Sequence, residues 1–166
     1  MITRINKTKA LCSFLHGIGM DPEEILNSED KNKYQMTVYL LQRYGIVLGY
    51  VFDTKNKCVF SQDLDATLNS LDPAIIHEAI SLARSESVTN YLNDFKNEFE
   101  NILNDPATLD LFTTMDFTNR KMFSGFSNKI ALKKAVFAER PELMEILNID
   151  KKFDDLYLDV VIRLHS

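Results

Sequence analysis

Residue types that could carry out chemistry occur along this sequence, but they are not spaced as in a catalytic or metal-binding motif. The three histidines, His16, His77 and His165, lie far apart, and none has a second ligand at a metal-binding spacing. The five glycines form no phosphate-binding loop, and no serine occupies a hydrolase nucleophile motif. We therefore predict no catalytic residue, no metal ligand and no cofactor, while an enzyme site built from distant residues stays open.

The two cysteines and the short apolar runs bear on the cellular compartment. Cys12 and Cys58 are 46 positions apart in apolar or β-like surroundings, which favours two buried free thiols over a disulfide. Apolar runs such as Ile46–Leu48 are far shorter than the roughly 20 residues that span a bilayer. No long apolar stretch follows the first residues, as it would in a secreted protein. We expect a cytoplasmic protein with no membrane partner.

Charged residues are strongly segregated along the chain, whose net charge is −5. Residues 60–116 carry 11 acidic and 2 basic side chains, whereas residues 117–140 carry 1 acidic and 6 basic side chains. Two interpretations are open: the basic segment binds a partner, or it neutralises residues 60–116 within the molecule. The isoelectric point of about 5.2 is unfavourable for non-specific nucleic-acid binding. The basic side chains concerned are Arg120, Lys121, Lys129, Lys133, Lys134 and Arg140.

The elements that would position these residues are mostly helical. Gly and Pro together number only 9 of 166 residues, too few for the many turns of a sandwich or barrel. Three prolines directly follow an aspartate, at Asp21, Asp72 and Asp105, and this pair is typical of a helix start. Apolar residues recur at helical spacing along most of the chain. We predict one domain spanning residues 1–166.

One segment departs from the helical period. Residues 46–52 are rich in β-branched and aromatic side chains, residues 53–57 are turn-like, and residues 58–60 could form a return strand. This pattern predicts a single antiparallel hairpin over about 46–61, which must pack against helices to be stable. The predicted fold is therefore mainly α: a single-domain helical bundle with one small antiparallel β-hairpin.

Parts of the sequence resemble a known family. The segments YQMTVYLLQRYG (34–45), LGYVF (48–52) and FSQDL (60–64) are similar to the YwgA-like family of bacterial and archaeal proteins, and more loosely to the Panacea domain of some antitoxins. The family's Gly-Pro before the serine is replaced here by Val59-Phe60. The resemblance implies a small, mostly helical fold with one hairpin, no established catalytic activity, and a setting in phage, mobile elements or toxin–antitoxin loci.

The function that these observations favour is a non-enzymatic protein-interaction or regulatory module. The hairpin and the basic segment would contact another protein, with Tyr44 and Tyr50 as aromatic anchors, because tyrosine is common at the centres of interfaces. A second copy of the chain could be that partner. These aromatic side chains could instead fill the core.

Two alternatives belong to other classes. In a winged-helix DNA-binding protein, the helix near residue 31 would enter the major groove and the hairpin would form the wing. The nucleic-acid contacts would then be Lys31, Asn32, Lys33, Gln35, Lys55 and Lys57. An enzyme with a site formed between the acidic and basic segments is the other alternative.

Overall fold

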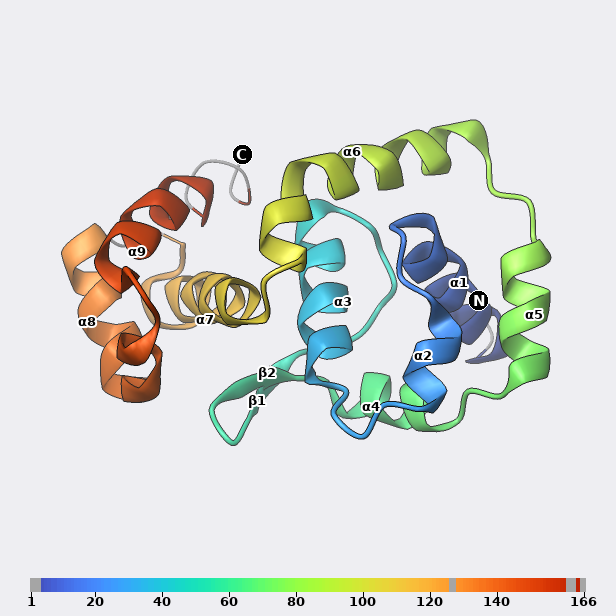
Figure 1. The fold of residues 1–166 in the computed structure, drawn as a ribbon, viewed down its shortest axis with the longest axis horizontal. Helices are drawn as coiled ribbons and strands as arrows, with labels where there is room; N and C mark the ends of the chain where they lie inside the picture. The colour runs from blue at the N-terminus through green and yellow to red at the C-terminus, as the bar shows by residue number, and fades with distance from the viewer. Residues whose placement is uncertain (1–3, 126–127, 161–163, 165–166) are drawn as a thin grey trace.

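A computed structural model of the chain describes residues 4–125, 128–160 and 164, and these residues are mainly helical (Figure 1). The prediction of a mainly α fold with one small antiparallel hairpin is confirmed. The elements are α1 (Arg4–Gly17), α2 (Pro22–Leu26), α3 (Asn32–Tyr44), β1 (Asp53–Lys55), β2 (Cys58–Phe60), α4 (Gln62–Asn69), α5 (Pro73–Ser81), α6 (Glu86–Leu103), α7 (Pro106–Phe123), α8 (Lys129–Glu139), the 3₁₀ helix η1 (Pro141–Glu145) and α9 (Ile149–Leu158). In this described part, no helix is both long and apolar enough to cross a bilayer.

Helix starts follow the aspartate–proline pairs. The Asp21 carboxylate accepts a hydrogen bond from the backbone N–H of Glu23, and Asp72 accepts one from Ile75, so both aspartates cap their helices. Asp105 precedes the first residue of α7, but its carboxylate accepts a hydrogen bond from the Thr108 hydroxyl at 2.5 Å. All three predicted starts are therefore helix starts.

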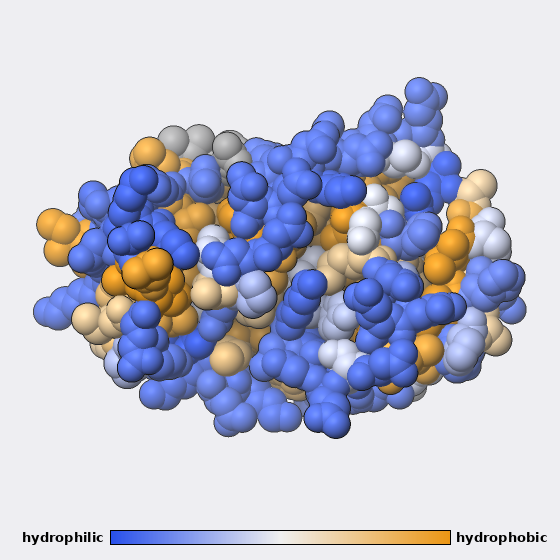
Figure 2. Space-filling model, in the orientation of Figure 1, coloured by the Kyte–Doolittle hydropathy of each residue, from blue (hydrophilic) through white to orange (hydrophobic). Residues whose placement is uncertain are grey.

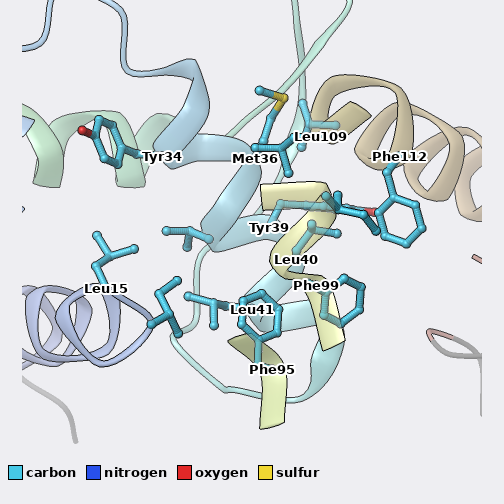
Figure 3. Close-up of a cluster of buried hydrophobic side chains, with 14 of the residues drawn as sticks. Leu15, Tyr34, Met36, Tyr39, Leu40, Leu41, Phe95, Phe99, Leu109 and Phe112 are labelled. Atoms are coloured by element: carbon cyan, nitrogen blue, oxygen red, sulfur yellow. The ribbon is translucent and has the colours of Figure 1, made fainter. Parts of the chain in front are cut away.

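Helix α3 lies at the centre of the molecule (Figure 1). It packs against α6, α7 and β2, while α7 in turn contacts α8 and α9. Every residue from 34 to 41 is buried. Figure 3 shows Leu40 and Leu41 of α3 beside the rings of Phe95, Phe99 and Phe112, which come from α6 and α7. The buried hydrophobic side chains of all these helices form one cluster, so α3 is the element on which the rest of the fold is assembled.

The hairpin is shorter than the sequence predicts. Its paired strands cover only residues 53–55 and 58–60, and the turn between them is formed by Asn56 and Lys57, both with positive φ. Two successive residues with positive φ are typical of the tight turn that suits the twist of a hairpin. The expectation that residues 46–52 form the first strand is wrong, since they pair with no strand in the described part of the chain.

Residues 46–52 nevertheless lie beside α3. Their side chains alternate between buried and exposed, which explains the β-like sequence pattern, but the amide of Gln42 takes the place of a neighbouring strand. Its Nε2 donates to the carbonyl of Tyr50 at 2.8 Å, and its Oε1 accepts from the Tyr50 N–H at 2.8 Å. The alternation therefore comes from packing on helices, not from a sheet.

A second glutamine of α3 holds the other end of the hairpin. Gln35 Oε1 accepts from the backbone N–H of Ser61 at 2.9 Å, and Gln35 Nε2 donates to the Ser61 carbonyl at 3.1 Å. The Ser61 hydroxyl then caps α4 by accepting from the N–H of Leu64. Two side-chain amides, at residues 35 and 42, thus fix both ends of the hairpin segment to the central helix.

Candidate binding site beside the hairpin

The basic segment does not present its cations as one face. Lys129 Nζ lies 3.3 Å from Asp154 Oδ1, and Lys133 Nζ lies 2.6 Å from Asp150 Oδ1. Both acidic residues belong to α9. One of the two interpretations expected residues 60–116 to neutralise the basic segment, but the carboxylates that pair with Lys129 and Lys133 lie outside those residues. Lys134 is exposed and forms no ion pair with any described residue.

The lysine pairs of α8 give a first testable prediction. Changing Lys129 and Lys133 together to glutamate should lower the free energy of unfolding by about 1 kcal/mol, because two exposed ion pairs are replaced by repulsion with α9. Urea denaturation would measure the loss, which should shrink in high salt. Lys134→Glu is the control and should leave stability unchanged. An equal loss from Lys134→Glu would contradict the assignment of the pairs.

Arg140 is held inside the molecule by carboxylates. Its Nη2 lies 2.8 Å from Asp110 Oδ2 and its Nη1 lies 3.1 Å from Asp110 Oδ1, while its Nε donates to Glu142. Burial by itself lowers the pKa of Arg140, but the bonds to these two carboxylates outweigh it and the pKa is raised. Arg140 is therefore a charged structural residue, and residues 60–116 supply two of its partners, the Asp110 carboxylate and the Thr114 hydroxyl.

Arg120 and Lys121 line two different hollows on either side of Phe117. The first, which we call the hairpin hollow, lies between the hairpin and α7 and has a volume of about 190 Å³. Its lining includes the buried Val59, the half-buried Phe117 and Met122, whose side chain is 57% exposed. An apolar floor with an exposed methionine beside it is suited to an apolar ligand.

Charges around the hairpin hollow are balanced. Lys121 Nζ lies 3.5 Å from Asp53 Oδ1, and Arg140 is paired with Asp110. The hydrogen bond from Arg140 is the largest cause of the lowered pKa of Glu142, and the nearby charge of Lys57 lowers that pKa further. Each cation thus has an anion near it. The hollow has no excess of positive charge, so it does not favour an acidic ligand, and its apolar floor is its distinguishing feature.

The second cavity, which we call the arginine hollow, lies where α3, α7 and residues 50–52 meet. It has a volume of about 360 Å³, and its lining includes Arg43 and Arg120. The fully buried Asp116 lies nearby and accepts hydrogen bonds from Tyr39 Oη at 2.5 Å and from Arg43 Nε at 2.8 Å and Nη2 at 3.2 Å. Arg43 Nη2 also donates to the Leu164 carbonyl.

Protonation states in this cluster are well defined. Burial raises the pKa of Tyr39 far above its usual range, and Asp116 raises it further, while Arg120 and Arg43 act in the opposite direction. Burial lowers the pKa of Arg43, but the bonds to Asp116 and Tyr39 outweigh it. Tyr39 is therefore a neutral hydroxyl donor and Arg43 a cation. The cluster binds two helices together, and its tyrosine and aspartate are too buried to meet a substrate.

The two aromatic anchors expected from the sequence pack on the core, Tyr50 inside it and Tyr44 at its edge. Tyr50 is only 5% exposed, and Lys7 Nζ covers its ring at 4.0 Å from the centroid. Tyr44 packs edge-on against Phe95 and Phe99. The Tyr50 ring is part of the core around α3, whereas Tyr44 is partly buried and packs against that core. For Tyr50, the structure favours the alternative that the side chain fills the core.

The helix expected to enter a DNA groove is the most buried helix of the fold. Asn32 and Lys33 are exposed at its start and Lys31 is half-buried before it, but Gln35 is only 1% exposed and both ends of its amide are bonded to Ser61. The next turns are buried on all sides, so α3 cannot lie in a major groove. The expectation that Gln35 contacts nucleic acid is corrected for this reason.

The remaining residues expected to matter are the hairpin lysines Lys55 and Lys57 and the two cysteine thiols. Lys55 and Lys57 are exposed on the hairpin, and Lys55 Nζ lies 4.7 Å from the centre of the Phe60 ring. Cys12 and Cys58 are free, and burial raises the pKa of both thiols, to about 11 for Cys12. Within the described residues, no group of three or more histidine, cysteine or acidic side chains could hold a metal ion.

Sequence reasoning missed Phe117 and Met122 of the hairpin hollow and the buried pair of Arg43 with Asp116. A signal for the pair was present: Asp116 follows the apolar residues Phe112 and Met115 on the buried side of α7, where a carboxylate needs a partner.

A comparison of the chain with protein-family models, curated proteins and solved structures finds no match. The resemblance to the YwgA-like family stays a prediction, and functional conclusions rest on geometry.

Proposed function

We propose that this protein is a non-enzymatic protein-interaction module and that it holds an apolar side chain of a partner protein in the hairpin hollow. The observation that carries the proposal is the hollow itself, with its apolar floor of Val59 and Phe117, its balanced charges and the exposed Met122. The two free cysteines support a cytoplasmic setting. A regulatory role in a mobile-element or toxin–antitoxin locus is supported only by the family resemblance.

Concave shape distinguishes this hollow from the exposed apolar residues around α8 and α9. Figure 2 shows hydrophobic side chains over the region of α8 and α9. Ile130 of α8, Met144 of η1 and Leu147, which precedes α9, are exposed. An anchor side chain contributes most when it fills a pocket and is fully desolvated, which a convex surface does not allow. Burying one such side chain contributes about 1.5–3 kcal/mol, and this corresponds to about a ten- to hundredfold gain in affinity.

The test compares two methionines of equal exposure. Met122 in the hairpin hollow is 57% exposed and Met144 in η1 is 58% exposed, so Met122→Glu and Met144→Glu add the same charge at matched solvent exposure. Wild-type protein and both variants would be used for affinity capture from the native host, with and without nuclease. We expect a protein partner that resists nuclease, is retained by Met144→Glu and is reduced at least about tenfold by Met122→Glu.

Three outcomes would contradict the proposal. Retention of the partner by Met122→Glu would exclude the hairpin hollow as its site. Loss through Met144→Glu alone would place the partner on the surface of η1 and α9. Release by nuclease would indicate a nucleic acid as the bridging molecule. Circular dichroism of both variants would verify that each is folded.

A further inference from the structure

We propose that the arginine hollow is a binding site for a small anion that carries a carboxylate or phosphate group, with Arg120 as its principal ligand-binding residue. This inference is independent of the proposed protein partner, because Arg120 does not line the hairpin hollow. It rests on three features of the hollow among the described residues: an excess of cationic charge, hydrogen-bond donors that bond to none of these residues, and aromatic walls.

Charge at the arginine hollow is not balanced. Two guanidinium groups, those of Arg43 and Arg120, line the cavity, and the carboxylate in contact with Arg43 is Asp116. That carboxylate is fully buried beneath the cavity and faces Arg43 and Tyr39. Arg120 is exposed and forms no ion pair with any described residue. Counting the residues that the structure describes, one positive charge therefore remains at the opening, in contrast to the balanced hairpin hollow.

Donors remain available on both guanidinium groups. The hydrogen bonds of Arg43 to described residues use Nε and Nη2, so its Nη1 is not engaged in them. Tyr39 and Arg120 both line the cavity, and Arg120 lies close enough to the Tyr39 hydroxyl to lower its pKa. An arginine presents five N–H groups in a planar fork, which matches two oxygens of a carboxylate or phosphate.

The walls of the cavity define the rest of the ligand. Phe52 and Phe117 line it, and their rings surround Tyr39, which makes edge-on contacts with both. At about 360 Å³ the cavity is larger than a simple anion requires. An anion with an aromatic or apolar body would place its charged group on Arg120 and its body against these rings. We therefore infer that an organic anion binds more tightly than inorganic phosphate.

The test is a nuclear magnetic resonance titration of the whole protein with phenyl phosphate, benzoate and inorganic phosphate. We expect saturable binding of both aromatic anions and weaker binding of inorganic phosphate. Arg120→Gln should weaken binding by about tenfold or more, because a charge-assisted bond is lost. The matched control is Lys134→Gln, which removes another exposed cation that has no ion pair in the described chain and should leave affinity unchanged.

Several outcomes would overturn the inference. One is the absence of saturable anion binding by the wild-type protein. The others are an equal loss of anion affinity in Lys134→Gln, and ligand-induced chemical-shift changes that map to residues outside the arginine hollow. Equal affinity for phenyl phosphate and inorganic phosphate would overturn the role of the aromatic walls. Met122→Glu distinguishes the anion site from the proposed partner site, because this variant should weaken capture of the protein partner without changing anion affinity.

Discussion

Replacing Arg43 by methionine is expected to lower the free energy of unfolding by about 3–5 kcal/mol, the usual cost of breaking a buried ion pair. The change removes two hydrogen bonds to Asp116 and one to the Leu164 carbonyl. The Asp116 carboxylate stays fully buried and loses the Arg43 cation. Urea denaturation followed by circular dichroism would measure the loss, provided that the slope of the transition does not change.

Two further variants make this result specific. Arg43→Met combined with Asp116→Leu removes both charges, and it should be more stable than Arg43→Met alone because no unpaired charge remains buried. Arg120→Met is the control from the neighbouring turn of α7; its guanidinium is exposed, and stability should change by less than about 0.5 kcal/mol. A loss below about 1 kcal/mol for Arg43→Met would show that the pair is not an important structural contact.

Gln35→Leu is expected to produce the second large effect, a loss of about 1–3 kcal/mol in the free energy of unfolding. The amide of Gln35 satisfies both the backbone N–H and the carbonyl of Ser61, at a position where the side chain is 1% exposed. Leucine is similar in size but can form neither bond, so the buried Ser61 N–H loses its partner, at about 1–3 kcal/mol. The Ser61 carbonyl keeps the hydrogen bond that it accepts from the Asp65 N–H at 2.9 Å. Chemical denaturation would measure the loss.

The same variant separates a structural glutamine from a nucleic-acid contact. Gln62→Leu is the control, because Gln62 is exposed at the first position of α4 and should change stability by less than about 0.5 kcal/mol. If Gln35 served only to contact nucleic acid, Gln35→Leu would leave stability intact. Such a result would contradict the buried hydrogen bonds described here.

Helix starts could be predicted because the interactions that form them are local. Asp21 and Asp72 bond to N–H groups two and three residues ahead, and the proline after each already has the backbone angle of a first helical turn. The class of the fold followed from these starts and from the helical spacing of apolar residues. Nothing distant in the sequence was needed for either inference.

Residues 46–52 show where local patterns become ambiguous. Alternating burial has the same sequence pattern whether a chain pairs with a strand or lies extended on helices. Here the bonding partner of Tyr50 is the side chain of Gln42 rather than another strand. A glutamine in an amphipathic helix gives no sign in the sequence that its amide will replace a neighbouring strand.

The sequence by itself therefore determined the helical class, the helix starts and the presence of a hairpin, since caps and turns depend on neighbours within a few residues. Only the tertiary structure decided which charges meet and which residues form the two hollows. Tyr39 and Asp116 are 77 positions apart, Arg43 and Asp116 are 73 apart, and Gln35 and Ser61 are 26 apart. The packing of α3 on α7 and the hairpin brings such partners together. The segregation of charge along the chain does not indicate that packing.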